Sequence, residues 1–330
     1  MLSELAAGAL LAGEPRARYC EMRAAAAPPG SVRPSMARLT GSWPGCVTSR
    51  LAASRLYVPP AVGSSGVMAS RRISRDELAA VFAYPGVADA YQYRPPYPPG
   101  VFDVLAQITA GRPRDVLDIG AGEGALARPL ASRFDHVDAL DISAAMAGAG
   151  RRRPGGRQSN LRWLAGAAES YGLDGPYALV TAGASLHWMS WPQTLPRLAR
   201  VMTTRAFLAI VDHGHHDVPW RRELAAVIAR HSRSPDYDPG FSVTGALAAA
   251  GLLDIAGRAV IAPVPFRQPV AAYVEQFHST SALAREWMPP AESAAFDRAI
   301  EKIVRPYAAG GMLEMEVAAE VAWGRPTAES

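Results

Sequence analysis

Three closely spaced glycines follow a short apolar segment and indicate a loop that holds a ligand. The segment reads Val116-Leu117-Asp118-Ile119-Gly120-Ala121-Gly122-Glu123-Gly124. Because glycine has no Cβ atom, such a loop can adopt positive φ angles and let a ligand approach the backbone. A strand, a glycine loop and a helix in this order are typical of nucleotide-like cofactor sites. The spacing is G-x-G-x-G, whereas dinucleotide-binding folds usually have G-x-G-x-x-G.

An acidic residue lies where a ribose-bearing ligand would need one. Asp141 comes directly after Val137-Asp138-Ala139-Leu140, at the end of the second expected strand, and follows Gly124 by 17 positions. In dinucleotide-binding folds an acid about 20 residues after the glycines accepts hydrogen bonds from ribose hydroxyls. The glycines alone could form a structural tight turn, but together with Asp141 they favour a cofactor site. We also count Asp118, at the end of the first apolar segment, among the candidate cofactor-binding residues.

Two histidines that follow expected strands are candidates for acid–base or substrate-binding roles. His187 follows the fourth expected strand, where an open α/β sheet leaves a crevice, and is the candidate general base. The alternative is a buried or helix-capping histidine, and Trp188 beside it would form either a pocket wall or core. His213 follows the fifth expected strand in Asp212-His213-Gly214-His215-His216-Asp217. That segment is similar to the start of a metallo-β-lactamase metal site but lacks its further ligands, so we expect no metal and a loop that faces solvent or substrate.

Alternating strands and helices are expected to position these residues. The patterns predict strands at residues 115–119, 136–140, 161–165, 177–182 and 206–211. They predict helices at residues 76–82, 99–110, 124–134 and 191–202, and Ser143 can cap another. Strands separated by helices indicate a parallel sheet with helices on both faces. The last third differs: helices are expected at 221–231, 243–250, 269–277 and 290–304, and strands within 252–263 and 313–323.

Charge and composition divide the chain near residue 67. Residues 1–67 hold seven Arg, three Glu and both cysteines, and they show no sustained period of 2 or 3.6. We expect a disordered extension, or upstream sequence translated from an early start with Met68 as the true start; an organelle transit peptide is the alternative. Residues 68–330 hold 27 basic and 27 acidic side chains, which argues against nucleic-acid binding. The run Arg151-Arg152-Arg153 is expected to complement a helix dipole.

The sequence gives no sign of a membrane segment or a secretory signal. No apolar run reaches the roughly 18 residues that a membrane-spanning helix needs. Glu4 precedes the apolar stretch 5–13, where a signal peptide would carry positive charge. We therefore expect a soluble, cytoplasmic protein.

Taken together, these motifs resemble the class I S-adenosylmethionine-dependent methyltransferases, and in particular the small-molecule, trans-aconitate methyltransferase-like group sometimes called type 11. The resemblance covers residues 75–325. It rests on the glycine loop, on 137–143, on Gly166-Ala167-Ala168-Glu169, on Ala184-Ser185-Leu186-His187-Trp188, and on Tyr93-Arg94-Pro95-Pro96-Tyr97-Pro98. The family fold implies a doubly wound, Rossmann-like sheet of seven strands, mostly parallel with an antiparallel last strand, and helical insertions around 213–250 and 267–310 that cover the substrate crevice.

The resemblance also implies roles for individual residues. Gly120, Ala121 and Gly122 would pass under the methionine part of the cofactor, and Gly124 is a further candidate cofactor-binding residue. Asp141 would hold the ribose hydroxyls, Ile142 would lie against the adenine, and Ala168 and Glu169 would lie near its edge. Arg94, Tyr97, Trp188, His213 and His278 would line the substrate pocket, with a surface histidine as the alternative for His278. Arg94, Arg221 and Arg222 are candidate partners for an anionic acceptor.

The resulting hypothesis is an enzyme that transfers a methyl group from S-adenosylmethionine to a small molecule, at a carboxylate or hydroxyl oxygen, by in-line displacement. A carboxylate is ionised near neutral pH and needs no base, whereas a hydroxyl or an activated carbon would be helped by His187. Alternatives are a methyltransferase acting on RNA or protein, a cofactor-binding protein without catalysis, and a nicotinamide oxidoreductase, against which the glycine spacing stands. The acceptor and the oligomeric state stay open.

Overall fold

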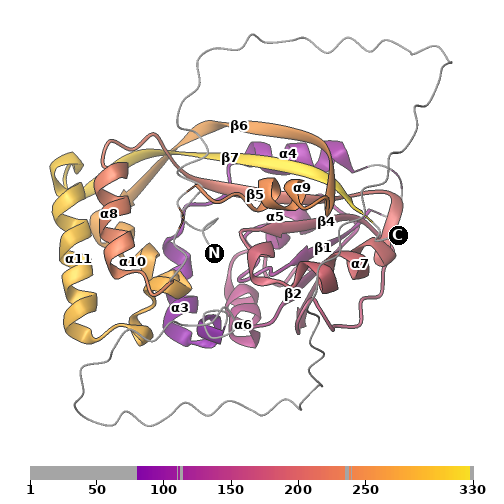
Figure 1. Cartoon of the computed structure of the whole chain (residues 1–330), viewed down its shortest axis with the longest axis horizontal. Coiled ribbons are helices and arrows are strands. Elements are labelled where there is room, and N and C mark those ends of the chain that lie inside the picture. Colours follow the sequence, from indigo (N-terminus) through magenta and orange to yellow (C-terminus); the bar gives the residue numbers. More distant parts are fainter. Residues whose placement is uncertain (1–79, 110, 112–113, 235–237, 239, 328–330) are drawn as a thin grey trace, which may run out of the picture. The chain divides into compact units, whose positions relative to one another are not determined.

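The computed structural model describes residues 80–109, 111, 114–234, 238 and 240–327, and within them seven strands form one sheet (Figure 1). The strand order is β3-β2-β1-β4-β5-β7-β6. Neighbours among β1 to β5 pair in parallel, while β7 is antiparallel to both β5 and β6. The expected mostly parallel sheet with an antiparallel last strand is confirmed. The strands are β1 (Asp115–Ile119), β2 (His136–Asp141), β3 (Leu161–Ala165), β4 (Tyr177–Gly183), β5 (Met202–His216), β6 (Leu253–Pro269) and β7 (Met312–Pro326).

The expected extension at residues 1–67 and the expected start at Met68 lie outside the described residues. The described α-helices mostly follow the predicted ranges. They are α3 (Pro85–Ala90), α4 (Pro99–Ile108), α5 (Ala127–Ala131), α6 (Ala144–Arg152), α7 (Trp191–Val201), α8 (Arg221–His231), α9 (Val243–Ala249), α10 (Val270–Glu275) and α11 (Pro290–Val304). Helix α5 is shorter than the predicted 124–134: it starts later, since Gly124 has φ +77°, which an α-helix does not accept, and it ends at Ala131.

Alternating side chains of the inner strands pack on both faces of the sheet. On β1, Val116 belongs to the cluster that includes α4 and α5, whereas Leu117 and Ile119 belong to the cluster that includes α7 and α9. Parallel strands covered by helices on both sides carry apolar residues in succession, which is why β1 and β4 were recognisable from sequence. This packing fixes the carboxyl ends of β1, β2 and β4, which carry the candidate site.

Strands β5, β6 and β7 extend well beyond their predicted ranges. The pairing of β5 with β7 continues to His216 opposite Glu316, and β6 follows β7 as far as Pro269 opposite Met312. The loop predicted from residue 213 is therefore strand as far as His216. Its Gly- and His-rich composition is typical of a loop, but antiparallel pairing with β7 provides partners for its backbone groups and outweighs the local propensity.

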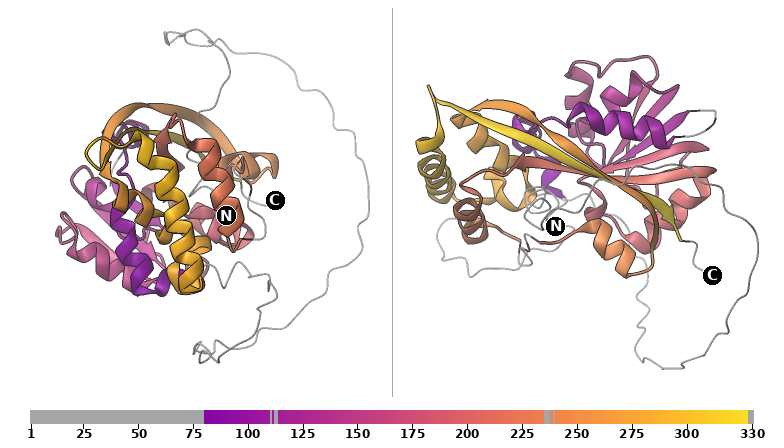
Figure 2. Two further views of the ribbon diagram at one scale, coloured as in Figure 1. Left: turned by 90° about the vertical axis from the view of Figure 1, so that its left-hand side faces the viewer. Right: turned by 90° about the horizontal axis from the view of Figure 1, so that it is seen from above.

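Helices α8, α10 and α11 lie at the far ends of these long strands, and we call these three helices the cap (Figures 1 and 2). Ile228, Tyr273, Phe296 and Ile300 share one apolar cluster within it. Helix α9 instead joins the cluster on the sheet, through Val243 and Leu247. The insertions expected at 213–250 and 267–310 therefore belong to the cap only in part. Their first residues are the ends of β5 and β6, and α9 packs on the sheet.

Residues 80–98, which we call the strap, run between α6 and the cap. Val81 and Phe82 pack against Met146 of α6, and Ala284 of the cap region belongs to the same cluster. The Ser143 hydroxyl donates to the Phe82 carbonyl oxygen at 2.8 Å. Part of the helix predicted at 76–82 lies outside the described residues, and Val81–Ala83 is a 3-10 turn. Proline starts a new helix at Pro85, so the strap is built of short pieces that bend over the sheet.

Candidate functional site

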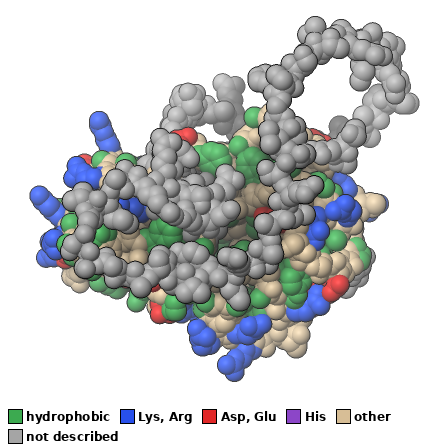
Figure 3. Space-filling model, turned by 60° about the horizontal axis from the view of Figure 1, so that its bottom comes forward, with side chains coloured by type: hydrophobic (Ala, Val, Ile, Leu, Met, Phe, Trp, Pro, Cys, Tyr) green, Lys and Arg blue, Asp and Glu red, His purple; other side chains and the backbone are tan. Residues whose placement is uncertain are grey.

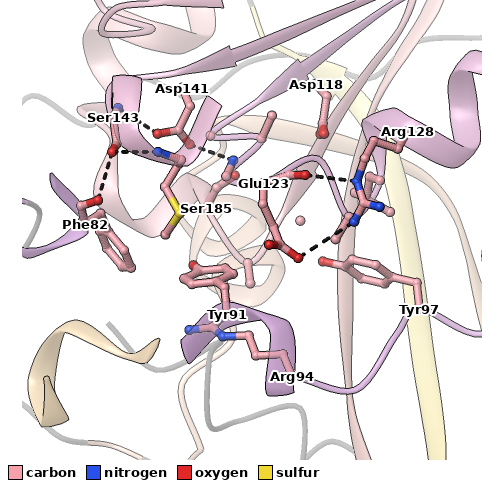
Figure 4. Close-up of a pocket in the computed structure, with 18 of the residues that line it drawn as sticks. Phe82, Tyr91, Arg94, Tyr97, Asp118, Glu123, Arg128, Asp141, Ser143 and Ser185 are labelled. Atoms are coloured by element: carbon pink, nitrogen blue, oxygen red, sulfur yellow. Dashed lines mark hydrogen bonds and ion pairs between the residues drawn. The ribbon is translucent and has the colours of Figure 1, made fainter. Parts of the chain in front are cut away.

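A cavity of about 1090 Å³ lies where the carboxyl ends of the parallel strands meet the strap (Figure 4). Segments that follow β1, β2, β3 and β4 line it, together with strap residues and parts of β5 and β6. Such a crevice is where open α/β sheets bind ligands. The sequence-predicted residues that line it are Arg94, Tyr97, Asp118, Gly120, Ala121, Gly122, Asp141, Ile142, Ala168, Glu169, Trp188 and His213.

The glycine loop follows β1 with a backbone that demands glycine. Gly120 has φ +61° and Gly122 has φ +57°, both in the left-handed region. A Cβ atom at Gly120 would also overlap Ser185, whose hydroxyl donates to the Ile119 carbonyl oxygen at 2.6 Å. The loop therefore lies tightly against the segment after β4 and presents bare backbone to the cavity.

The third glycine of the motif serves packing instead. Gly124 has φ +77° and does not line the cavity. A Cβ atom there would overlap the ring of Trp163 on β3. Gly124 therefore allows the start of the following helix to pack closely on the sheet, which is the role of the third glycine in dinucleotide-binding folds.

Asp141 is held in place by two backbone N–H groups. Its Oδ2 accepts from the Gly122 N–H at 2.7 Å, and its Oδ1 accepts from the Ser143 N–H at 2.8 Å. Burial raises the pKa of Asp141, while these two hydrogen bonds act in the opposite direction. Each carboxylate oxygen can accept further hydrogen bonds. The geometry therefore suits a ligand with paired hydroxyls beside the glycine loop.

Asp118 lies deeper, at the end of β1. Its Oδ1 accepts from the Thr181 hydroxyl at 2.7 Å, and its side chain is buried. Burial raises the pKa of Asp118 to about 7, although the hydrogen bond from Thr181 opposes the shift. Near neutral pH this group can therefore be a neutral donor or an anionic acceptor toward a ligand in the cavity.

One side of the cavity, the cofactor half, presents apolar surface next to Asp141. Ile142 is 64% exposed although it is a large hydrophobic residue, and it lines the cavity with Phe82 and Trp188. The rings of Phe82 and Trp188 meet edge to face, with centroids 5.5 Å apart. Exposed apolar groups gathered in a cavity are typical of a ligand site, here one for a flat apolar group adjacent to the paired hydroxyls.

Arg94, Tyr97 and His213 line the other side, which we call the acceptor half. The ring of Tyr97 stacks on that of His213, with centroids 3.8 Å apart. Burial raises the pKa of Tyr97 and lowers that of His213 to about 4, so both side chains are neutral at pH 7. The Arg94 guanidinium lies 4.0 Å from the centroid of the Tyr91 ring (Figure 4).

His187 does not lie at the cavity. Its side chain is 1% exposed within the turn Leu186–Trp188, and its neighbour Trp188 takes the place on the cavity wall. The turn after β4 points only one of two adjacent side chains to the crevice, which sequence alone does not resolve. The prediction that His187 faces the crevice as a base is therefore wrong for this structure.

We expect His187→Ala to lower the melting temperature but leave turnover per folded molecule within about threefold of the wild type. Loss of a buried ring leaves a void, and about 1 kcal/mol shifts the melting point of a domain of this size by ~2–4 °C. Thermal melts and single-turnover rates test this. A drop of about a hundredfold in the chemical step at an unchanged melting temperature would instead identify His187 as a base.

His278 lies inside the cap, away from the cavity, so its predicted place in the substrate pocket is also wrong. Its Nδ1 lies 2.7 Å from the Leu283 carbonyl oxygen, and its Nε2 lies 2.7 Å from Asp297 Oδ1. Burial raises the pKa of Asp297, but hydrogen bonds from His278 and Arg285 outweigh that effect and hold the pKa below its usual range. His278 thus fastens the cap, and the surface-histidine alternative is also excluded because the side chain is buried.

Several cavity residues escaped the sequence analysis. Arg153 had been assigned to a helix end, but its Nε donates to Glu123 Oε2 at 2.8 Å. Arg128 donates through Nε to the carbonyl oxygens of Glu123 and Gly124 and through Nη1 to that of Pro154. The two arginines tie the glycine loop to the turn after α6. In the sequence, only the presence of Glu123 within the glycine motif and of Arg128 and Arg153 nearby could have indicated this contact.

Ala184 is a second missed feature. It lines the cavity directly after β4 with φ +49°, a left-handed conformation that is uncommon for alanine. Strain of this kind is found at ligand sites, where the surrounding structure holds it. Arg221 and Arg222, by contrast, do not line the cavity, so of the three arginines predicted to meet an anionic acceptor only Arg94 is in place.

Within the described ranges no helix is long and apolar enough to cross a membrane. The same part of the chain contains no cluster of three or more His, Cys, Asp or Glu side chains arranged to hold a metal ion. On the face shown in Figure 3, the visible Lys and Arg side chains are scattered along the margin of the described surface.

Comparison with known proteins gives consistent matches. Residues 116–205 match the family model "Methyltransferase domain". A trans-aconitate 2-methyltransferase from Mycobacterium sp. (strain KMS) is 32% identical over 137 residues, 41% of this chain and 52% of that protein. An uncharacterized methyltransferase from Mycobacterium bovis is 32% identical over 169 residues, 50% of this chain and 64% of that protein. The chain thus spans about half to two thirds of the length of these relatives.

A solved structure assigned to the type II methyltransferases, from Anaeromyxobacter dehalogenans, has a TM-score of 0.51 and 22% identity and covers 71% of this chain and 99% of that one. At this identity the match shows the fold. The family model spans β1 to the start of β5, which includes the glycine loop and Asp141. The resemblance drawn from the sequence motifs is confirmed for residues 116–205, which match a methyltransferase domain, and the fold is that of the solved methyltransferase.

Proposed function

We propose that the protein transfers the methyl group of S-adenosylmethionine to a carboxylate oxygen of a small organic acid. One observation carries the proposal: a single cavity holds both the cofactor residues of the family and the fixed guanidinium of Arg94. The relatives named trans-aconitate 2-methyltransferase support an acid as acceptor.

The residues of the cofactor half fit S-adenosylmethionine. Asp141, oriented by two backbone N–H groups, would accept the ribose hydroxyls, and the exposed Ile142 would cover the adenine. Ala168 and Glu169 would lie near the adenine edge; the carboxylate of Glu169 accepts from the Ser190 N–H at 2.9 Å. Gly120 and Gly122 leave room for the methionine part. When bound, the cofactor supplies an electrophilic methyl group on its sulfonium.

Arg94 is arranged to hold an acid in the same cavity. Its Nε donates to the Ser279 hydroxyl at 2.7 Å, and its Nη2 donates to the Ser279 carbonyl oxygen at 3.0 Å. These bonds and the stacking on Tyr91 fix the plane of the guanidinium. A planar, permanently charged guanidinium is well suited to bind a carboxylate.

A carboxylate acceptor requires little further chemistry from the chain. With an unperturbed pKa near 4 it is already ionised, so the residues need only align it with the methyl group and exclude water. A hydroxyl acceptor would need a base. His213 lines the cavity, but its pKa of about 4 makes it a weak one, so we favour the carboxylate.

Labelled S-adenosylmethionine tests the proposal against a panel of small di- and tricarboxylic acids, phenols and an RNA. We expect label in acids, released as methanol by mild alkali because the product is a methyl ester. Phenols should give an alkali-stable ether if they react at all. Label in phenols or RNA but not in any acid would contradict the proposed acceptor. The absence of a nucleic-acid acceptor stays a prediction, which the RNA arm of the panel tests.

A further inference from the structure

Two buried polar atoms on residues that line the acceptor half have no hydrogen-bond partner among the described residues. They are Nδ1 of His213 on β5 and Oε1 of Gln268 on β6. The Gln268 side chain is almost fully buried, at 4% exposure. A buried polar group without a partner destabilises the folded state, because it has lost its hydrogen bonds to water. Native proteins therefore nearly always supply such an atom with a partner from protein, water or ligand.

The identity of the Gln268 atom is fixed by its neighbour. The amide nitrogen Nε2 donates to the Tyr93 carbonyl oxygen at 2.6 Å. A carbonyl oxygen only accepts, so the amide cannot be turned the other way without losing this bond. The atom left without a partner is therefore the carbonyl oxygen of the side chain, a hydrogen-bond acceptor.

The same argument fixes the tautomer of His213. Its Nε2 lies 2.9 Å from the Pro95 carbonyl oxygen, so Nε2 carries the hydrogen. Burial keeps the ring neutral at pH 7, which leaves a lone pair on Nδ1. The second atom without a partner is therefore also an acceptor, and only a donor can satisfy it.

Both atoms are on side chains of residues that line the acceptor half of the cavity. Gln268 and His213 hold Tyr93 and Pro95, the two strap residues on either side of Arg94. A third buried polar atom on the cavity lining, Nε1 of Trp188, also has no partner in the described part of the chain. It is a donor, and Trp188 packs on Phe82 in the cofactor half, so it does not bear on the acceptor.

We propose that the methyl acceptor carries a hydrogen-bond donor, a hydroxyl or amino group, in addition to the carboxylate bound by Arg94, and that Gln268 and His213 receive that donor. The inference rests on the proposed function and narrows the acceptor to hydroxy or amino acids. Ionised trans-aconitate has no such donor. The site is therefore expected to bind a hydroxy acid more tightly than an otherwise equal acid that lacks the hydroxyl.

Matched pairs of acids test this by calorimetry on the complex with S-adenosylhomocysteine. Suitable pairs are malate and succinate, citrate and tricarballylate, and 4-hydroxyphenylacetate and phenylacetate. We expect the hydroxy acid to bind about tenfold or more tightly in at least one pair, since 1–3 kcal/mol corresponds to roughly 5- to 150-fold. Binding is measured without turnover, so the result is independent of whether the acid is methylated.

The variant Gln268→Lys removes the acceptor atom Oε1 but can keep the hydrogen bond to the strap. An ammonium group can still donate to the Tyr93 carbonyl oxygen but accepts no hydrogen bond. We expect the preference for the hydroxy acid to fall to within about threefold of unity, because the lost interaction is its physical basis. Gln92→Lys is the matched control: Gln92 also lines the cavity and donates to a backbone carbonyl oxygen, that of Asp89, but it is exposed. It should keep the preference.

Equal affinities within every pair would overturn the inference and mean that water alone pairs with the two atoms. A preference that survives in Gln268→Lys would overturn it as well, and so would the failure of both members of every pair to bind. Failure of the proposed function is separate: it would show as no binding of S-adenosylhomocysteine, or as no transfer of label to any acid.

Discussion

Asp141→Ala should weaken the binding of S-adenosylhomocysteine by roughly tenfold to a thousandfold. The carboxylate is expected to accept two ribose hydroxyls, and each hydrogen bond to a charged group contributes about 1.5–3 kcal/mol. A factor of ten corresponds to ~1.4 kcal/mol. The substitution also leaves the N–H groups of Gly122 and Ser143 without their present acceptor, which loosens the glycine loop. Calorimetry on purified protein measures the effect directly.

Two further variants serve as controls for the Asp141→Ala measurement. Asp254→Ala removes an exposed carboxylate on β6 and should leave affinity unchanged. Asp141→Asn keeps the size and one carbonyl oxygen, so it should fall between the wild type and alanine. If Asp141→Ala melts like the wild type and binds the cofactor equally well, the acid does not lie at the ribose, and the assignment of the cofactor half fails.

The cofactor half could be predicted from sequence because its signal is local. The glycine loop follows β1 and Asp141 ends β2, two adjacent and largely buried strands, and the chain places the two within one βαβ unit. Backbone requirements limit the residue types at Gly120 and Gly122. The same local logic gave the capping role of Ser143, whose hydroxyl accepts from the Met146 N–H at 3.2 Å.

The acceptor half could not be predicted in the same way because tertiary contacts create it. Arg94 and Ser279 are 185 positions apart, and Gln268 and Tyr93 are 175 apart, yet each pair is hydrogen-bonded. Those contacts depend on the extra length of β5 and β6, which carries the cap to the strap. The sequence pointed to Arg94 by its motif but gave no sign of what holds it. His187 is the opposite case. Sequence correctly placed it directly after β4, but its side chain does not line the cavity.

Arg94→Met should lower kcat/KM for the acid acceptor by roughly tenfold to a hundredfold or more. The variant keeps an unbranched apolar chain of similar reach but loses the charge, and a charge-assisted bond contributes about 1.5–3 kcal/mol. Most of the change should appear in KM, because the guanidinium holds the carboxylate before and during transfer. Arg94→Lys should recover only part of the loss, since an ammonium cannot make two parallel hydrogen bonds.

Arg222→Met supplies the matched control, because Arg222 is an exposed arginine of α8 that does not line the cavity. It should leave both KM and kcat within about twofold. The affinity of each variant for S-adenosylhomocysteine decides what Arg94 holds. If Arg94→Met weakens cofactor binding while KM for the acid stays the same, the guanidinium pairs with the carboxylate of the cofactor's own methionine part. The acid acceptor would then lack its cation, and the reason to prefer a carboxylate over a hydroxyl would be lost.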